Sequence, residues 1–313
     1  MHRPSLPRRP RAVVLGATLL LLAGCSSSSD KLNADNVDEG YNPIGPASRA
    51  EDRIGKYLGD LSTSINAWNA MTLNAATKEE ARKQNLLEVN IRERVNNRFP
   101  EILTELETGP DRNRVIAAAA VGFSRDPAAL SPLIAALDDT NEQVISNALL
   151  GLGMFASPET PLGKVGDLLR YSTDSKTRWS AADCALSLVA AGASTEGIIE
   201  PARAGLTDAE EPMVIAQCAL LLAMAGDTDS IDALGDLLFD ELPIVSTSAA
   251  RALAWLGNHH DEYEGPAARA LFAAMEAGDR RLQERVRPEL IRLSSRDYEY
   301  KVDEWEEWVE RLP

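Results

Sequence analysis

The residues best suited to binding a metal ion form one short cluster. His259 and His260 are adjacent, and Asp261, Glu262 and Glu264 follow them. Imidazole and carboxylate groups bind transition metals such as zinc. Adjacent side chains in a turn, however, cannot easily aim two imidazoles at one ion, and the third histidine of the chain stands far away at position 2. We therefore predict a solvated polar loop that holds no metal ion and no cofactor.

Other patterns that carry chemistry are missing from the sequence. It contains no Gly-x-Ser-x-Gly, no glycine-rich phosphate loop, no Cys-x-x-Cys and no His-Glu-x-x-His. The segment Asp227–Asp232 resembles a calcium loop only faintly, because its sixth position is not glycine and Leu238 stands where a bidentate glutamate is needed. We attribute these acids to helix capping, and we predict no catalytic residue and no enzymatic activity.

Two cysteines lie in the body of the chain, Cys184 and Cys218. No histidine is near either of them in sequence to activate a thiolate. Both fall in alanine-rich stretches at nearly matching places of neighbouring repeats. Packed helices lie about 8–10 Å apart, whereas a disulfide needs Cα atoms within about 7 Å. We favour two buried free thiols, and a disulfide is the alternative.

The first 24 residues have the parts of a signal peptide. Four arginines and no acid accompany an apolar run, Ala12–Leu22, which ends in Leu-Ala-Gly-Cys with the cysteine at position 25. This run is too short for a membrane-spanning helix, which takes about 20 residues. The string resembles the lipobox of bacterial lipoproteins, and the resemblance implies cleavage before Cys25 and lipidation of that cysteine. An ordinary secretory signal with a chance cysteine is the alternative.

Residues 25–48 are predicted to be a lipidated flexible tether, because they are polar and turn-rich and have no apolar period. Ser26, rather than aspartate, follows the cysteine. By resemblance to lipoprotein sorting in bacteria with two membranes, this favours the outer membrane, with the protein facing the periplasm. Arg8 and Arg9 also permit a twin-arginine export signal, although Pro10 and Arg11 interrupt that pattern.

The charge of the protein limits its partners. The net charge is −16, and removal of the four arginines in residues 1–24 would make it more negative. Such a polyanion is repelled by nucleic acid phosphates and by anionic lipid headgroups. We find no cluster of lysine and arginine that would offset this repulsion. We therefore predict no nucleic acid partner, and membrane attachment through the N-terminal lipid alone.

The body of the chain repeats. Five segments share an apolar anchor, small residues four and five positions later, and an apolar or small residue seven or eight positions later; a degenerate sixth follows. The anchors are Val115, Val144, Trp179, Val214, Val245 and Leu282. Positions 0, 4, 7 and 8 share one helix face, so small residues there let another helix approach closely. A period of roughly thirty residues accommodates two helices and their turns.

The recurring Val-x-x-x-Ala-Ala/Leu-x-Ala/Gly-Leu pattern, the turn at Asp126-Pro127 and the exit at Asp138-Asp139 resemble HEAT repeats. They are most similar to the short kind first associated with phycobilisome bilin lyases. The resemblance covers residues 109–296 and implies an all-α, right-handed α-solenoid of about five to seven helical hairpins. A non-repetitive helical bundle with an alanine-rich core is the alternative. The register is weakest around Trp179 and at Pro288.

Both ends of the repeats are predicted to be caps. Residues 49–108 have helical periodicity and form one or two N-terminal capping hairpins. Residues 297–313 form a C-terminal capping helix, in which Trp305, Trp308 and Val309 share one face. Terminal units of a solenoid need a polar outer surface. We favour a closing helix over a partner-binding groove for this aromatic stripe.

Two functions follow from this organisation. The first is a non-catalytic, membrane-anchored scaffold that binds a protein or peptide partner, since solenoids present extended curved surfaces. The second, implied by the family resemblance, is a lyase or chaperone-like enzyme related to the bilin lyases; export argues against it because their substrates are cytosolic. The candidate partner-binding loop runs from Gly257 to Pro266 and contains His259, His260 and Tyr263. A tolerated insertion with no role is the alternative.

Overall fold

The computed structural model describes residues 46–74, 77–209 and 211–313. The predicted signal peptide, most of the predicted tether and Cys25 lie outside these residues. All regular structure in the described ranges is helical, with no strand. The α-helices are α1 (Pro46–Asn74), α2 (Lys78–Asn97), α3 (Phe99–Thr108), α4 (Asp111–Gly122), α5 (Leu130–Ala135), α6 (Glu142–Phe155), α7 (Gly163–Tyr171), α8 (Ser175–Ala190), α9 (Ile199–Thr207), α10 (Pro212–Met224), α11 (Ile231–Leu237), α12 (Pro243–His259), α13 (Glu264–Ala277), α14 (Arg280–Ser294) and α15 (Val302–Val309).

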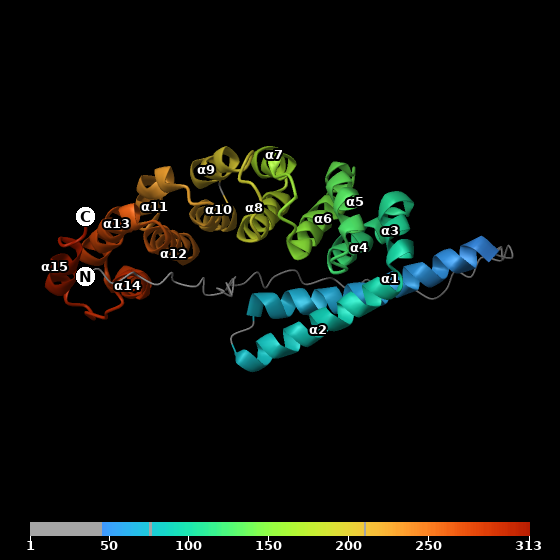
Figure 1. Ribbon diagram of the computed structural model, residues 1–313, viewed down its shortest axis with the longest axis horizontal. Helices are drawn as coiled ribbons and strands as arrows, with labels where there is room; N and C mark the ends of the chain where they lie inside the picture. Colours follow the sequence, from blue (N-terminus) through green and yellow to red (C-terminus); the bar gives the residue numbers. More distant parts are fainter. Residues whose placement is uncertain (1–45, 75–76, 210) are drawn as a thin grey trace, which may run out of the picture.

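From α3 to α14 the helices form two rows that follow an arc (Figure 1). The odd-numbered helices form the outer row and the even-numbered helices form the inner row. Each outer helix packs on the inner helix that follows it, and successive inner helices pack side by side. This arrangement is an α-solenoid, as the sequence predicts. The predicted boundary at residues 108 and 109 falls in the turn between α3 and α4, which pack together as one pair.

Small residues let the inner helices approach each other closely. A Cβ atom placed on Gly122 of α4 would lie 2.2 Å from the carbonyl oxygen of Gly151 in α6. A Cβ atom on Gly151 would lie 2.4 Å from the carbonyl oxygen of Ala118. Real Cβ atoms do not approach backbone atoms this closely, so only glycine fits at these two positions. The small positions of the repeat are therefore packing positions.

The register of the third repeat differs from the prediction. Thr177 of α8 is 1% exposed and takes the anchor position, whereas Trp179 is half-buried two residues later. Thr177 fits in the interior because its Oγ1 lies 3.1 Å from the Ser146 Oγ of α6 and also donates to Asp174. The sixth repeat holds no break, since α14 continues through Pro288.

The N-terminal hairpin of α1 and α2 covers one end of the arc. Leu58, Leu61 and Trp68 of α1 are buried at helical spacing, and the Trp68 ring meets Phe123 edge-on with the ring centroids 5.2 Å apart. Because α1 packs along α4, the inner side of α4 is not free. Helix α1 begins at Pro46, inside the predicted tether; proline is favoured in the first turn of a helix.

The C-terminal helix α15 closes the other end. Trp305 is fully buried and its Nε1 donates to the Glu299 carbonyl oxygen over 3.0 Å. Its ring meets Tyr298 and Trp308 edge-on, with centroid distances of 4.8 Å and 6.0 Å. Helix α15 packs against α13. The aromatic stripe is therefore covered and does not form a groove.

Candidate partner-binding face

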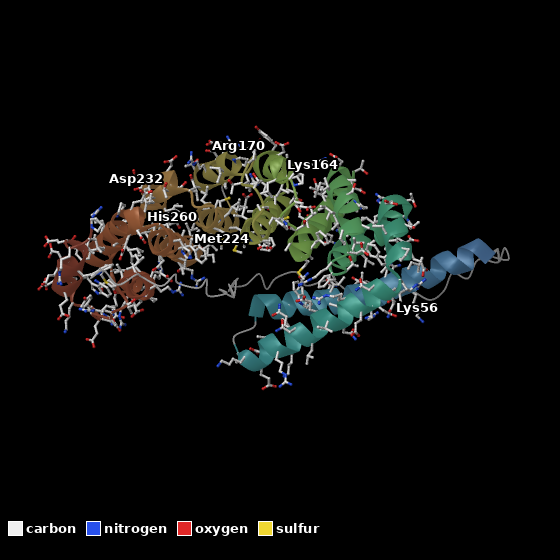
Figure 2. All side chains as sticks on the ribbon, viewed as in Figure 1. Lys56, Lys164, Arg170, Met224, Asp232 and His260 are labelled. Atoms are coloured by element: carbon white, nitrogen blue, oxygen red, sulfur yellow. The ribbon has the colours of Figure 1, made fainter. Side chains whose placement is uncertain are left out.

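The side of the inner row that faces away from the outer row is called here the inner face. It is best marked by the residue six positions after each anchor, together with the residue one helical turn later. The anchor of the third repeat is Thr177. The residues marked in this way are Leu150 and Met154 on α6, Asp183 and Ser187 on α8, Leu220 and Met224 on α10, and Arg251 and Trp255 on α12; all are half-buried. Figure 2 shows Met224 on the inner side of the arc, and Lys164, Arg170 and Asp232 on its outer side.

Between α6 and α10 the inner face is mostly apolar, and Asp183 is its acid. The Asp183 Oδ1 accepts a hydrogen bond from the Gln217 Nε2 of α10 over 2.8 Å. No lysine or arginine of the described residues forms a salt bridge with it. Burial raises the pKa of Asp183 to about 6, because a carboxylate without a cation is poorly stabilised away from water. This acid is therefore structurally costly at neutral pH.

At α12 and α14 the inner face becomes basic. Arg285 donates from Nη1 to the Ser246 Oγ over 3.0 Å, and Arg292 donates from Nη1 to the Glu289 Oε2 over 2.8 Å. Glu289 is 3% exposed, and burial raises its pKa although the charges of Arg292 and Arg251 act in the opposite direction. The sequence-based statement that the chain has no cluster of arginines is thus wrong for this end of the solenoid.

The predicted histidine loop is much shorter in the structure. Helix α12 continues to His259 and α13 begins at Glu264, so Gly257 lies inside a helix. A Cβ atom on Gly257 would lie 3.0 Å from the Leu293 Cδ2 and 3.1 Å from the Ala267 Cβ. Gly257 is therefore a packing residue, and the prediction of a long turn is wrong.

The three candidate residues of that segment lie against the solenoid. The His259 ring stacks on Trp255 with centroids 3.9 Å apart, and its Nδ1 donates to the Trp255 carbonyl oxygen over 2.8 Å. His260 meets Tyr263 edge-on at 6.5 Å. His259 thus adjoins the inner face through Trp255, whereas His260 and Tyr263 lie in the connection to α13. No cluster of three or more metal-ligating residues occurs in the ranges that the structure describes.

Asp227 does not cap a helix as predicted. Its carboxylate accepts hydrogen bonds from the Arg203 guanidinium, with an Nε to Oδ2 distance of 2.8 Å, and from the Ser230 hydroxyl. Burial acts to raise the pKa of Asp227, but these hydrogen bonds outweigh it and hold the pKa below the usual value. This acid thus ties α9 to the turn that leads into α11 on the outer row.

Both cysteines of the body are buried free thiols, as favoured from the sequence. They face different neighbours. A Cβ atom on Gly205 of α9 would lie 2.4 Å from the Cys218 Sγ, whereas Cys184 packs beside Gly153 of α6. Burial raises the pKa of both thiols, that of Cys218 to about 12. Neither is suited to act as a nucleophile.

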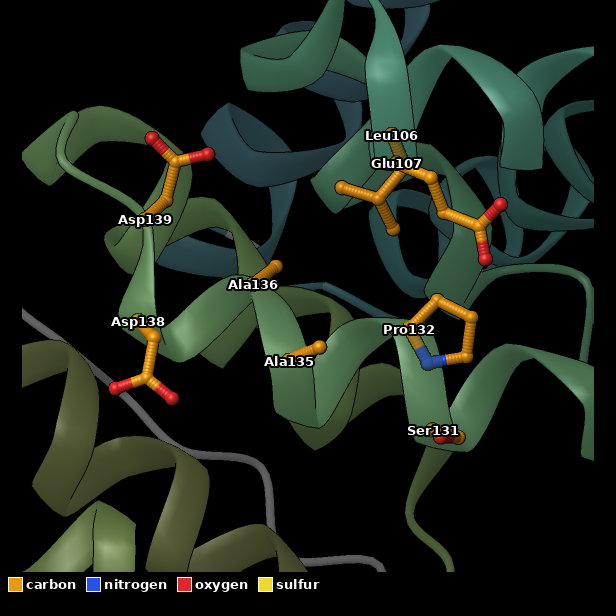
Figure 3. A pocket seen from close by; sticks show the side chains of 8 residues that line it. All are labelled: Leu106, Glu107, Ser131, Pro132, Ala135, Ala136, Asp138 and Asp139. Carbon is orange, nitrogen blue, oxygen red and sulfur yellow. The ribbon is translucent and has the colours of Figure 1, made fainter.

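Two shallow hollows occur on the outer row. One, of about 310 Å³, lies between α3 and α5 (Figure 3). Glu107, Asp138 and Asp139 line it, but the two aspartates point away from each other, and they pair with Lys164 and Arg114 respectively. The other, of about 520 Å³, lies between α11 and α13 and is bordered by the exposed ring of Phe239. Neither brings catalytic groups together.

Residues 199–287 match the family model described as HEAT repeats, and residues 114–139 match the model of the PBS lyase HEAT-like repeat. The chain therefore contains HEAT-like repeats. No curated protein matches the sequence. No helix in the described ranges has the length and apolar character needed to cross a membrane.

Several solved structures are similar to the chain. A designed armadillo repeat protein is 20% identical, with 62% of this chain and 99% of that chain covered and a TM-score of 0.48. An engineered protein is 19% identical over 77% of this chain and 73% of its own, with a TM-score of 0.48. The complex of CpcE and CpcF of phycocyanin lyase from Nostoc sp. PCC7120 is 22% identical over 60% of this chain and 74% of that chain, with a TM-score of 0.42.

Proposed function

We propose that the protein is a membrane-anchored, non-catalytic scaffold that holds an extended segment of a protein partner along its inner face, from α6 to α14. The observation that carries the proposal is the continuous inner face itself. Side chains recur on it at matching positions of successive helices, and they are half-buried, so each keeps part of its surface exposed. Helix α1 covers the inner side of α4, so the free stretch begins at α6.

The anchor is the second part of the proposal. Lipidation of Cys25 would attach the protein to the cell envelope, with the outer membrane and the periplasm as the expected location. Two or three acyl chains are sufficient for stable anchoring. Cys25→Ser should release the protein from membranes into the soluble fraction or block its processing. If the variant stays in the detergent phase as the parent protein does, the anchor is wrong.

Crosslinking and affinity purification from intact membranes test the scaffold. We expect a distinct partner to be recovered with the parent protein and to be lost when Leu150, Leu220 and Met224 are replaced together by glutamate. Glutamate at the exposed Tyr171, Phe239 and Leu242, which lie outside the set that marks the inner face, gives the same change of charge and provides the control. Equal recovery from both triple variants would place the partner elsewhere.

The alternative is a lyase or chaperone-like enzyme, favoured by the match of residues 114–139 to the PBS lyase HEAT-like repeat. A bilin absorbs visible light, so binding is easily measured. Under the alternative, purified protein mixed with a bilin should co-elute with the pigment in gel filtration. Under the scaffold proposal, the pigment and the protein should elute separately.

A further inference from the structure

The charges of the two rows of helices are segregated. In the outer row, α3 carries three glutamates and α11 two aspartates, with no basic residue in either helix, and the terminal helix α15 carries four acids. In the inner row, α10 carries no charged residue and α14 carries five arginines against two glutamates. The protein as a whole has a net charge of −16. Positive charge is therefore concentrated at one end of the inner row.

Some of the arginines on α12 and α14 are not neutralised by carboxylates of the described ranges. Arg287 pairs with Asp297 and Arg280 with Glu284. By contrast, Arg251 and Arg285 form no salt bridge with any acid in the described ranges; the Arg285 guanidinium contacts the Ser246 hydroxyl.

Arg251, Arg285, Arg292 and Trp255 form what we call the arginine end of the inner face. Glu289 lies four residues after Arg285 and three before Arg292, so these two arginines share its side of α14. The charge of Arg251 also acts on Glu289 from α12. The charges of Arg251 and Arg292 thus act on one buried carboxylate, and Arg285 lies one helical turn before it, which leaves excess positive charge at this place. Trp255 lies one helical turn after Arg251.

From these observations we propose that the arginine end binds the carboxylates of an acidic, extended polypeptide segment, whose apolar side chains lie on Leu220 and Met224. This inference rests on the proposed function and specifies the partner's chemistry. Arginine binds carboxylates with two parallel hydrogen bonds, and Trp255 adds an apolar surface beside them.

The shape of the molecule favours a polypeptide over other polyanions. The helices that carry the arginine end, α12 and α14, belong to the inner row, which follows the concave side of the arc (Figure 1). A flat bilayer cannot follow a concave surface, and the overall negative charge repels the dense phosphates of nucleic acid. An extended chain fits, because successive inner helices are about 10 Å apart and each extended residue spans about 3.3 Å. About twelve residues would reach from α6 to α14.

A synthetic peptide tests the inference on the full-length protein. The probe is a fluorescein-labelled peptide of about twelve residues that alternates glutamate pairs with leucine. We expect saturable binding in fluorescence anisotropy, and at least tenfold weaker binding after Arg251→Ala with Arg285→Ala. Arg251→Lys with Arg285→Lys keeps the charges but loses the paired hydrogen bonds, so it should weaken binding less than the double alanine variant does. Arg170→Ala changes an outer-row arginine that pairs with Asp208 and should change nothing. Circular dichroism confirms that each variant is folded.

The controls separate the possible outcomes. The same peptide with glutamine in place of glutamate should not bind; equal binding of both peptides would overturn the inference. Failure of the parent protein to bind the acidic peptide would also overturn it. Phosphatidylglycerol vesicles should bind the parent and the double alanine variant equally, because binding through the N-terminal lipid does not depend on these arginines. Vesicle binding that depends on Arg251 and Arg285 would replace the peptide with a membrane. Residues 26–45 of this chain, which are acidic in sequence, would be the occupant if neutralising their acids strengthened peptide binding at least tenfold.

Failure of this inference and failure of the proposed function give different results. If the partner is recovered through Leu150, Leu220 and Met224 but the acidic peptide does not bind, the scaffold stands and only the chemistry of its partner is wrong. If neither is observed, both fall.

Discussion

The inner and outer rows of helices alternate along one chain but are built differently. The inner helices α6, α8, α10 and α12 have 14, 16, 13 and 17 residues, whereas the outer helices α5, α7, α9 and α11 have 6, 9, 9 and 7. Ion pairs join successive units along the outer row, as in Arg170 with Asp208 and Arg203 with Asp227. In the inner row, Gly122 and Gly151 bring the backbones of α4 and α6 into close contact.

This difference separates the parts that hold the arc from the parts that are free to bind. On the outer row, Arg170 and Arg203 already pair with acids of the next unit, so a partner would have to replace these ion pairs there. On the inner face, Leu150, Leu220 and Met224 make no such pairs, and Arg251 forms no salt bridge in the described part of the chain. The comparison predicts that the free energy of unfolding depends on small changes of side-chain volume on the inner row and on changes of charge pairing on the outer row.

The largest effect is expected from added volume between inner helices. Gly122→Ala places a Cβ atom 2.2 Å from the Gly151 carbonyl oxygen, and we expect it to lower the free energy of unfolding by about 2–3 kcal/mol. Gly163→Ala on the outer row meets nothing within 4 Å and should be neutral or slightly stabilising. Thermal melting followed by circular dichroism measures both. Equal melting temperatures of the Gly122→Ala and Gly163→Ala variants would show that the contact between α4 and α6 is not tightly packed.

The second effect concerns the unpaired acid of the inner face. Burial raises the pKa of Asp183 to about 6 from the unfolded value of 3.8, so the folded state binds a proton more tightly. Its contribution favours the folded state below about pH 4 and is lost as the pH rises through 6. Asp183→Asn should therefore stabilise the protein by about 1–3 kcal/mol at pH 7.5 and much less at pH 4. A variant with the same stability as the parent at both pH values would show that Asp183 is well solvated.

An acid of the outer row should behave in the opposite way. The folded pKa of Asp227 is lowered, so its stabilising contribution is present above the unfolded value and is lost as the pH falls through the folded value. Asp227→Asn should lower the free energy of unfolding by about 1 kcal/mol at pH 7, with the difference disappearing in acid. Denaturant titrations at several pH values check this. If the effects of Asp183→Asn and Asp227→Asn on stability changed in the same direction with pH, the electrostatic difference between the two rows would be wrong.

The smallest effect is expected at the edge between the rows. Replacing His259, His260 and Tyr263 together by alanine removes the stacking of His259 on Trp255, which is worth about 0.5–1.5 kcal/mol. Because Trp255 then loses its fixed orientation, partner capture should weaken on the order of a few-fold. Crosslinking yield and melting temperature are the measurements. Unchanged capture would confine the partner to the inner face.

The helical repeats could be predicted because they depend on local spacing. Small residues at positions four, seven and eight share a helix face wherever they occur, so Ala148 and Gly151 reveal their role without knowledge of their neighbours. The anchor of the third repeat could not be predicted in this way. A buried threonine is acceptable only because Ser146 and Asp174 supply hydrogen bonds from elsewhere in the fold, and the larger Trp179 is the stronger sequence signal.

The candidate site was harder to predict, since it depends on contacts between repeats. Gly257 has the sequence signature of a turn, but it lies in α12, where Leu293 and Ala267 leave little room for a side chain. The arginines of the inner face are dispersed in sequence between positions 251 and 292, and the overall charge of −16 conceals them. Alignment of the second, fourth and fifth repeats on their anchors places Arg251 at the same position as Leu150 and Leu220, and this signal is present in the sequence.

The central claim is that the inner face, and not the outer row, holds the partner. A photo-crosslinking amino acid placed singly at Leu220 or Met224 on the inner face, and at Lys164 or Asp232 on the outer row, tests it in intact cells. We predict one discrete crosslinked product from Leu220 and Met224 and none from the outer positions. Crosslinks from Lys164 and Asp232, with none from the inner face, would contradict the account.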